Sequence, residues 1–325
     1  MILRAQRKPL APADVPEPVP VHDEVRIRVS ACAVCRTDLH ILDGELRRPK
    51  LPLVLGHQAV GVVDAAGPEA AGVSVGDRVG VPWLASTCGA CARCLDGHEN
   101  LCAEARFTGY DVDGGYAEEM IARAAFAVPL PDGYSDLEAA PLLCGGLIGY
   151  RAWRMAPDAE VIGLYGFGSA AHMILQVARA RGQRVFAFTR AGDAAAQAFA
   201  VELGADWVGG AGEPPPEPLD AALIFAPAGE LVPTALRDVR PGGTVVCAGI
   251  HMSDIPSFPY ELLWGERVLR SVANLTRADA REFFEATAAQ PVRTAVHPYP
   301  LAAANEALAA LRAGEIQGTA VLRIR

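Results

Sequence analysis

The sequence lacks the marks of a membrane, nucleic-acid-binding or disordered protein. No apolar run approaches the roughly 18–20 residues that cross a bilayer; the longest, Ala139–Tyr150, is interrupted by Pro141, Gly145 and Gly146. Basic residues are scarce, with 29 Lys and Arg against 38 Asp and Glu and a formal net charge of −9. We therefore expect no surface for nucleic acid or anionic lipid. Hydrophobic residues make up 51% of the 325 residues and charged residues 21%, which is typical of about two folded globular domains.

The first 21 residues contain no uninterrupted apolar stretch of the kind found in secretion signals. A cytoplasmic location is therefore expected. In that compartment the eight cysteines are expected to stay reduced rather than to form disulfides.

Four of the cysteines, Cys88, Cys91, Cys94 and Cys102, lie within fifteen residues. Such a cluster suits one ion better than two cramped disulfides, since Zn²⁺ favours tetrahedral sulfur coordination. A closed site of four ligands leaves no position for chemistry, so the spacing predicts a structural zinc. Disulfides, an iron–sulfur cluster and a lost site are the alternatives.

The first ~145 residues predict an all-β region with long loops, because short apolar runs alternate with Gly and Pro. The expected strands there are Val25–Val29, Val60–Asp64 and Arg78–Val81.

From Ala156–Glu160 onward the pattern changes to strands that alternate with helices. This alternation predicts a parallel sheet with right-handed crossovers. The expected strands are Val161–Tyr165, Val185–Thr189, Ala221–Phe225 and Thr244–Gly249, and the expected helices are Ala170–Arg181 and Ala194–Leu203. After Ala273 the pattern weakens, with helices expected at Ala278–Ala288 and Leu301–Ala313 and a strand at Thr319–Ile324.

The segment Gly166-Phe-Gly168-Ser169-Ala170-Ala171 lies between an expected strand and an expected helix. It has the form G-x-G-x-x-G/A, in which the first glycine permits a tight turn and the second lets the backbone approach a pyrophosphate. The helix start at Ser169 and Ala170 then presents its amides to the phosphates. This context favours dinucleotide binding over a plain tight turn.

The strand after this helix ends in Thr189 and Arg190 without an acidic residue. A carboxylate at that position accepts the ribose hydroxyls of NAD, whereas a cation accommodates the 2′-phosphate of NADP. Thr189 and Arg190 therefore favour NADP(H) over NAD(H). In the alternative interpretation Arg190 is a solvated charge and Asp193 binds the ribose.

Three further candidate metal ligands are Cys35, His57 and Cys144, which are far apart in the sequence. Each alone has an ordinary explanation as a buried thiol or a structural histidine. Together they form a Cys₂His set, which is known for catalytic zinc with a fourth position left open.

The chain resembles the zinc-dependent alcohol dehydrogenases of the medium-chain dehydrogenase/reductase family from end to end. The matching motifs are Cys35-Arg-Thr-Asp-Leu-His40, Gly56-His57, Val75-Gly-Asp-Arg-Val79, the four-cysteine cluster, Cys144 and Gly166-x-Gly168. The resemblance implies an α/β fold: a GroES-like β-rich catalytic domain (residues 1–149 and 275–325) and a Rossmann doubly wound domain with a parallel sheet (150–274).

The resemblance also implies that Cys35, His57 and Cys144 hold a catalytic zinc. It assigns Thr37 to the alcohol oxygen, as the start of a proton relay that passes by the nicotinamide ribose to His40. The alternative for His40 is an exposed loop residue.

Four neighbouring roles follow from the same resemblance. Arg36 contacts the cofactor pyrophosphate, and Asp38 orients His57, unless Asp38 is only a charge at a helix start. Trp83 lines the substrate pocket with Leu46 opposite, the alternative being ordinary core packing.

The sequence departs from the family pattern at two positions. Gln58 stands where the family commonly has Glu after the zinc-binding histidine, so a negative charge near the zinc is missing. Thr319 replaces the Arg that often follows the glycine matched by Gly318, so one contact to a cofactor phosphate is in doubt.

The expected function is hydride transfer between a small primary alcohol or aldehyde and a nicotinamide cofactor. We expect two zinc ions per chain, one catalytic and one structural, and by resemblance a homodimer or homotetramer. A polyol or cinnamyl-type zinc dehydrogenase is the nearest alternative, and a non-catalytic nucleotide-binding homologue is the alternative outside enzymes.

Overall fold

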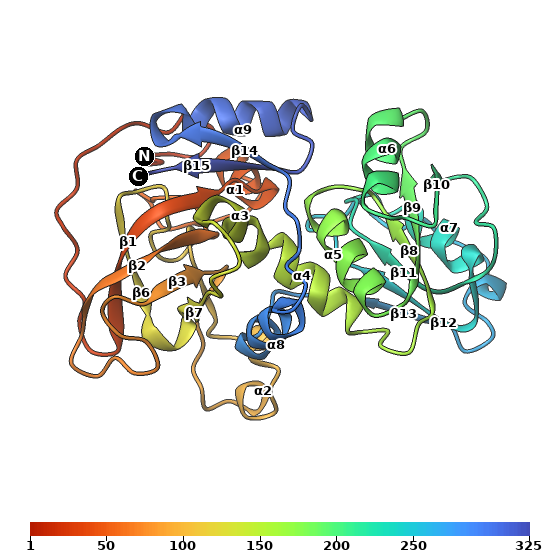
Figure 1. The fold of residues 1–325 in the computed structure, drawn as a ribbon, viewed down its shortest axis with the longest axis horizontal. Helices are drawn as coiled ribbons and strands as arrows, with labels where there is room; N and C mark the ends of the chain where they lie inside the picture. The colour runs from red at the N-terminus through yellow and green to blue at the C-terminus, as the bar shows by residue number, and fades with distance from the viewer. The chain divides into compact units, whose positions relative to one another are not determined.

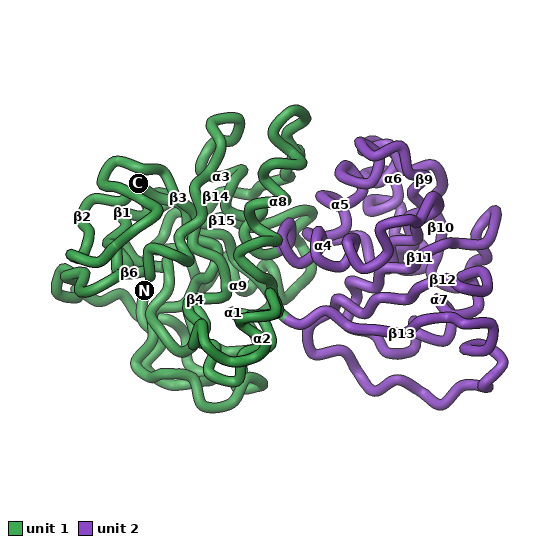
Figure 2. Tube along the Cα trace, turned by 90° about the horizontal axis from the view of Figure 1, so that it is seen from below, with its two compact units in different colours: residues 1–144, 274–325 green, residues 145–273 purple.

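The computed structural model describes residues 1–325, which divide into two compact units (Figure 2). Unit 1 comprises Met1–Cys144 and Asn274–Arg325, and unit 2 comprises Gly145–Ala273. None of the helices has the length and apolar character that crossing a bilayer requires.

Unit 1 is built on a seven-stranded sheet in the order β14-β15-β1-β2-β3-β7, with β6 paired to β1. Its strands, visible in Figure 1, are β1 (Glu24–Ala33), β2 (Ala59–Ala66), β3 (Arg78–Val81), β6 (Glu119–Arg123), β7 (Val128–Pro129), β14 (Val296–Pro300) and β15 (Thr319–Arg323). β1 is central because it pairs antiparallel with β2, β6 and β15. Its residues Val25, Ile27 and Val29 alternate toward the core and are fully buried, as the alternating sequence predicted.

The strands expected in the first part of the chain are confirmed, but the expectation of an all-β region is wrong. The first 144 residues also contain the helices α1 (Arg36–Asp43), α2 (Ala92–Leu95) and α3 (Asp136–Ala139). The return segment of unit 1 contains α8 (Arg277–Thr287) and α9 (Ala304–Ala313), which confirm the helices expected there. α1 forms because Cys35 and Asp38 make a capping box at its start, and Gly44 ends it in the left-handed conformation at φ 82°. These two signals define only eight residues, too few for a clear helical period.

Unit 2 contains a six-stranded parallel sheet in the order β10-β9-β8-β11-β12-β13. The strands are β8 (Val161–Tyr165), β9 (Arg184–Thr189), β10 (Trp207–Gly210), β11 (Leu219–Ile224), β12 (Val239–Cys247) and β13 (Val268–Ser271). Counted from β8, the order is 3-2-1-4-5-6, which is that of the doubly wound dinucleotide-binding sheet. The parallel sheet expected from the alternating pattern and the Rossmann domain implied by the resemblance are therefore both confirmed.

The helices of unit 2 are α4 (Gly145–Trp153), α5 (Ser169–Ala180), α6 (Ala194–Glu202) and α7 (Leu231–Asp238). α5 and α6 begin and end within two residues of the expected positions. α4 was not clearly indicated by the sequence, because three of its nine residues are glycines. One of them, Gly149, lets α4 approach α5, since a Cβ there would lie 2.3 Å from Cγ1 of Ile174.

The close approach of α4 and α5 predicts that Gly149→Ala overpacks their interface, at a cost of about 1–3 kcal/mol. The midpoint of urea unfolding should fall accordingly. In an Ile174→Ala background, where the obstructing atoms are absent, adding Gly149→Ala should cause no further loss. An unchanged midpoint for Gly149→Ala alone would show that the contact is not tight.

Candidate functional site

Unit 1 brings the side chains of Cys35, His57 and Cys144 together. Their ligand atoms all lie within 4.8 Å of one another, although the residues come from the start of α1, the segment before β2 and the end of the 3₁₀ helix η3 (Ala140–Leu143). The two Sγ atoms are 3.9 Å apart, close to the ~3.8 Å that tetrahedral zinc with Zn–S near 2.3 Å requires. A disulfide bond is only about 2.05 Å long.

His57 provides the observation that tests whether a metal ion fits. The side chain is fully buried, and its Nε2 atom has no hydrogen-bond partner. A buried polar atom without a partner is costly unless an ion or ligand satisfies it. A cation held by two thiolates and this nitrogen would satisfy it, so the donor set fits zinc with one coordination position left open.

Asp38 faces the other side of the His57 ring. Its Oδ1 atom lies 3.4 Å from His57 Nδ1, while its Oδ2 atom accepts hydrogen bonds from the backbone N–H of Cys35 at 2.8 Å and from the hydroxyl of Tyr116 at 3.1 Å. The carboxylate thus both caps α1 and lies beside His57. The sequence offered two interpretations of Asp38, as a charge at the helix start and as the group that orients His57. In the structure the one buried carboxylate makes both contacts.

The charges around His57 shift its protonation when no metal is bound. Burial disfavours the imidazolium, but the Asp38 carboxylate and the Cys35 thiol together outweigh burial and raise the pKa of His57 to about 10. The hydrogen bond with Cys144 holds the pKa of Cys35 well below its usual value, and the same pairing raises the pKa of Cys144. Protons therefore occupy His57 and Cys144 at neutral pH in the metal-free protein.

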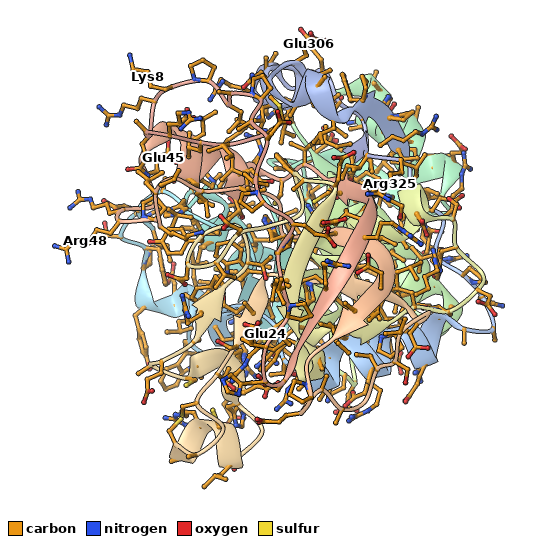
Figure 3. All side chains as sticks on the ribbon, turned by 90° about the vertical axis from the view of Figure 1, so that its left-hand side faces the viewer. Lys8, Glu24, Glu45, Arg48, Glu306 and Arg325 are labelled. Atoms are coloured by element: carbon orange, nitrogen blue, oxygen red, sulfur yellow. The ribbon has the colours of Figure 1, made fainter.

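Thr37 and His40 lie on α1 next to this cluster. Thr37 is buried, and its Oγ1 atom accepts a hydrogen bond from the Cys35 thiol at 3.6 Å. His40 lies one turn further along, and its Nδ1 atom pairs with Glu45, a surface side chain labelled in Figure 3. Arg36, the first residue of the helix, is exposed. The sequence did not indicate Glu45, because only the turn after Gly44 brings it back to the helix.

Trp83 forms a wall beside the cluster. Its ring meets the His57 ring edge-on, with centroids 5.0 Å apart and an interplanar angle of 77°, and stacks on Phe107 at 5.0 Å. Its Nε1 atom donates to the Oδ1 atom of Asn274 at 3.1 Å. Leu46 is half-buried against the apolar core of the same unit, and its backbone N–H donates to the carbonyl oxygen of His40.

The four cysteines of the second cluster converge on a lobe formed by α2 and the short strands β4 (Leu84–Ser86) and β5 (Arg106–Phe107). Their closest Sγ–Sγ distances are 3.5 to 3.9 Å, which again fits one tetrahedral zinc ion rather than disulfides. Backbone N–H groups of Ala90 and Cys91 donate toward Cys88 and lower the pKa of its thiol to about 7. The four predicted ligands of the structural zinc site therefore lie together in the lobe.

Contacts that the sequence did not indicate tie this lobe to the return segment of the chain. Glu99, which lies in the lobe, accepts three hydrogen bonds from the guanidinium of Arg277, at 2.6 to 3.0 Å. Asn274 donates from Nδ2 to the carbonyl oxygen of Asn100 at 3.2 Å while it accepts from Trp83. Asn274 adopts the left-handed conformation, with φ 56°. These partners are more than 170 residues apart, so no local pattern reveals them.

The dinucleotide loop occupies the turn between β8 and α5 in unit 2, as the sequence predicted. Gly166 has φ 89°, and a Cβ there would lie 2.7 Å from the backbone nitrogen of Ala226, so glycine is required by the turn itself. Gly168, the N-cap of α5, has open space where its Cβ would be. Packing within the protein does not require this second glycine, and the free space above the helix start fits a phosphate.

The end of β9 differs in part from expectation. Thr189 is buried, and its hydroxyl bonds to the carbonyl oxygens of Arg190 and Gly209, at 3.0 and 3.4 Å, and accepts from Gln197. This hydroxyl therefore holds β9, β10 and α6 together. Arg190 is exposed, whereas Asp193 caps α6 through a bond from the N–H of Ala196.

The two positions that depart from the family pattern are both buried. Gln58 lies directly after the metal-ligand candidate His57, and its carbonyl oxygen accepts from the N–H of Ala33. Thr319 begins β15, and its N–H donates to the carbonyl oxygen of Ala295.

The protonation of the Cys35, His57 and Cys144 cluster leads to a prediction about metal binding. Zinc must displace protons from His57 and Cys144, so binding should release protons and weaken as the pH falls. Calorimetric zinc titrations of metal-free protein, in buffers with different ionisation enthalpies and at two pH values, measure both effects. The difference between the wild type and Cys144→Ala isolates this site. The same affinity at both pH values, with no proton release, would contradict the prediction.

Comparison with known proteins places the chain in a family. Residues 21–132 match the alcohol dehydrogenase GroES-like domain. The probable alcohol dehydrogenase AdhA of Mycobacterium tuberculosis is 48% identical over 318 residues, which cover 95% of this chain and 91% of that protein. An alcohol dehydrogenase of Geobacillus stearothermophilus is 37% identical, covering 98% and 97%. The structure of a cobalt- and zinc-bound thermostable alcohol dehydrogenase from Pyrobaculum aerophilum has a TM-score of 0.88 at 27% identity, covering 99% and 98%. Because these relatives match nearly the whole chain, it belongs to the zinc-type medium-chain alcohol dehydrogenases.

Proposed function

We propose that the chain is an NAD(P)-dependent zinc alcohol dehydrogenase that interconverts small primary alcohols and aldehydes. The observation that carries this proposal is the convergence of Cys35, His57 and Cys144, with the fully buried Nε2 atom of His57 lacking a partner. Three ligands leave a fourth position for substrate, which is the arrangement of a catalytic rather than a structural zinc. The relatives named above as alcohol dehydrogenases support the same activity.

In this proposal the chain's own residues hold and orient the metal. A zinc ion, when bound, supplies a positive charge that favours loss of the hydroxyl proton from an alcohol and polarises an aldehyde carbonyl. Cys35 and Cys144 would hold it as thiolates, and His57 would hold it as a neutral ring. Asp38, 3.4 Å from His57 Nδ1, fixes the orientation of that ring.

Thr37 and His40 are proposed to carry the proton between substrate and solvent. The Thr37 hydroxyl lies beside the Cys35 thiol, where it can accept the proton of the alcohol while passing on its own. His40, one turn along α1 and paired with the surface residue Glu45, forms the outer end of this path. A nicotinamide cofactor, when bound, would supply the hydride chemistry.

The cofactor is proposed to bind through the loop of unit 2. Gly166 and Gly168 shape this loop, and the first amides of α5, at Ser169 and Ala170, are oriented to receive the pyrophosphate. Arg36 is a further proposed contact to that group, since its guanidinium is exposed. The open space at Gly168 supports this assignment.

We favour NADP(H) as the cofactor, because β9 ends without an acidic residue and Arg190 is exposed directly after it. Of the two residues proposed from the sequence, Arg190 is the one available for a 2′-phosphate. The hydroxyl of Thr189 instead donates a hydrogen bond to the carbonyl oxygen of Arg190.

The substrate pocket is proposed to include Trp83 and Leu46. Trp83 is fixed by its stacking on Phe107 and by its bond to Asn274, so it forms a rigid apolar wall next to His57. A rigid aromatic wall beside the metal ligands favours small alcohols and aldehydes.

The chain is also proposed to form a homo-oligomer and to work in the cytoplasm. β13 is the last strand of its sheet, and Val268, together with the neighbouring Tyr260 and Trp264, is exposed. An open apolar edge is suited to pairing with a second copy, in line with a homodimer or homotetramer. Thiolate ligands at both zinc sites need a reducing compartment such as the cytoplasm.

The two zinc sites predict different consequences for two matched cysteine variants. We expect about two zinc ions per chain in the wild type, and about one in both Cys144→Ala and Cys88→Ala. Cys144→Ala should abolish turnover but keep cofactor binding, because the dinucleotide loop belongs to unit 2. Cys88→Ala should instead lower thermal stability. Metal analysis, steady-state assays and cofactor titration measure these outcomes. Full activity in Cys144→Ala would refute the proposed function.

Arg190→Ala tests the cofactor preference. Loss of a charged contact to the 2′-phosphate, worth about 1.5–3 kcal/mol, should lower kcat/KM for NADPH by roughly 10–100-fold and leave that for NADH nearly unchanged. Arg181→Ala is the matched control, since Arg181 is exposed at the opposite end of α5. An unchanged ratio of NADPH to NADH efficiency in Arg190→Ala would count against NADP(H).

A further inference from the structure

Tyr116 lies next to the candidate catalytic cluster, but none of its hydrogen bonds is made to a candidate metal-ligand atom. It is completely buried, and its hydroxyl donates to the Oδ2 atom of Asp38 at 3.1 Å. No motif in the sequence indicated this residue. It follows two glycines in the segment Gly114-Gly115-Tyr116, which precedes β6.

The backbone of this segment runs along the residues that lead to His57. The N–H of Gly114 donates to the carbonyl oxygen of Val54, that of Gly115 to Gly56, and that of Tyr116 to Leu55, at 2.8 to 2.9 Å. A Cβ at Gly114 would lie 2.1 Å from the carbonyl oxygen of Gly56. Only glycine permits so close an approach, so Tyr116 is fixed relative to the backbone that carries His57.

The ring of Tyr116 also restricts Gly56, the residue immediately before His57. A Cβ on Gly56 would lie 2.4 Å from the ring atom Cδ1 of Tyr116, and Gly56 has φ 97°. The aromatic ring therefore packs against the bare α-carbon of Gly56. Tyr116 thus reaches His57 by two routes, one through the chain at Gly56 and one through the carboxylate of Asp38.

We infer that Tyr116 is a positioning residue for the zinc ligand His57, acting through Asp38. A carboxylate is planar, so fixing its Oδ2 atom between the Tyr116 hydroxyl and the Cys35 N–H sets the direction of Oδ1. Oδ1 is the atom that lies 3.4 Å from His57 Nδ1. Without the hydroxyl, Asp38 keeps one donor on Oδ2 and gains freedom to rotate away from the ring. Mutation of the groups that orient metal ligands commonly changes metal affinity by about 10–100-fold.

This inference rests on the proposed zinc site, and Tyr116→Phe tests it because phenylalanine keeps the ring that packs on Gly56. Tyr165→Phe is the matched control. Tyr165 is also fully buried and donates to a carboxylate, Asp238 Oδ2 at 2.7 Å, but both residues belong to unit 2, whereas both cysteine clusters belong to unit 1. Both variants lose a phenol–carboxylate bond, and only one should affect the metal.

The measurement is zinc retention against a chelator, followed by metal analysis, with Cys144→Ala identifying the release phase of the His57 site. Tyr116→Phe should weaken that phase by about 10–100-fold and leave the phase of the four-cysteine lobe unchanged. Tyr165→Phe should change neither phase. Wild-type retention in Tyr116→Phe, or equal losses in both variants, would overturn the inference.

A double-mutant cycle with Asp38→Asn tests the route through the carboxylate. If Tyr116 acts through Asp38, adding Tyr116→Phe to Asp38→Asn should weaken zinc retention little further; fully additive losses would overturn the inference. These readouts need no turnover. Two bound zinc ions without alcohol oxidation would refute the proposed function and leave the role of Tyr116 standing.

Discussion

The structure of unit 1 depends on compensating the charge of one fully buried carboxylate. Asp38 has no exposed surface, and a buried charge is costly unless it is hydrogen-bonded and paired. Its partners are the amide that starts α1, the Tyr116 hydroxyl and the His57 ring. The helix start, the glycine segment and the approach to β2 meet at this group. The start of α1, the glycine segment and the candidate metal ligand His57 are therefore all held by the same carboxylate.

The cysteine clusters and the dinucleotide loop lie in different units because the two units have different kinds of sheet. The mainly antiparallel sheet of unit 1 leaves long connections, and these carry both cysteine clusters, since loops on a rigid scaffold commonly carry function. The parallel sheet of unit 2 places a glycine turn and a helix start at the carboxyl end of β8, where such sheets bind nucleotides. The fold explains where each site lies, but only the side chains define its chemistry.

Which features could be predicted from the sequence depends on how far apart along the chain the interacting residues lie. The four cysteines of the lobe and the Gly166–Gly168 turn lie within short segments, so spacing predicted the first, and spacing together with the flanking strand and helix predicted the second. Cys35, His57 and Cys144 are separated by up to 109 residues, and their convergence was expected from the family resemblance rather than from any local period. Tyr116 and Asn274 act through contacts across 78 and 191 residues. Thr189 was expected to face a ligand, but its hydroxyl is used inside the sheet, which no strand pattern reveals.

The interrupted connectivity of unit 1 has a consequence for synthesis on the ribosome. β1 pairs with β15, so the central strand of unit 1 lacks one of its neighbours until the final residues have emerged. Unit 2 is continuous from Gly145 to Ala273, and all its strands are available earlier. Domains generally fold as units while the chain is being made. The nascent chain can therefore complete the sheet of unit 2 while the sheet of unit 1 still lacks β14 and β15.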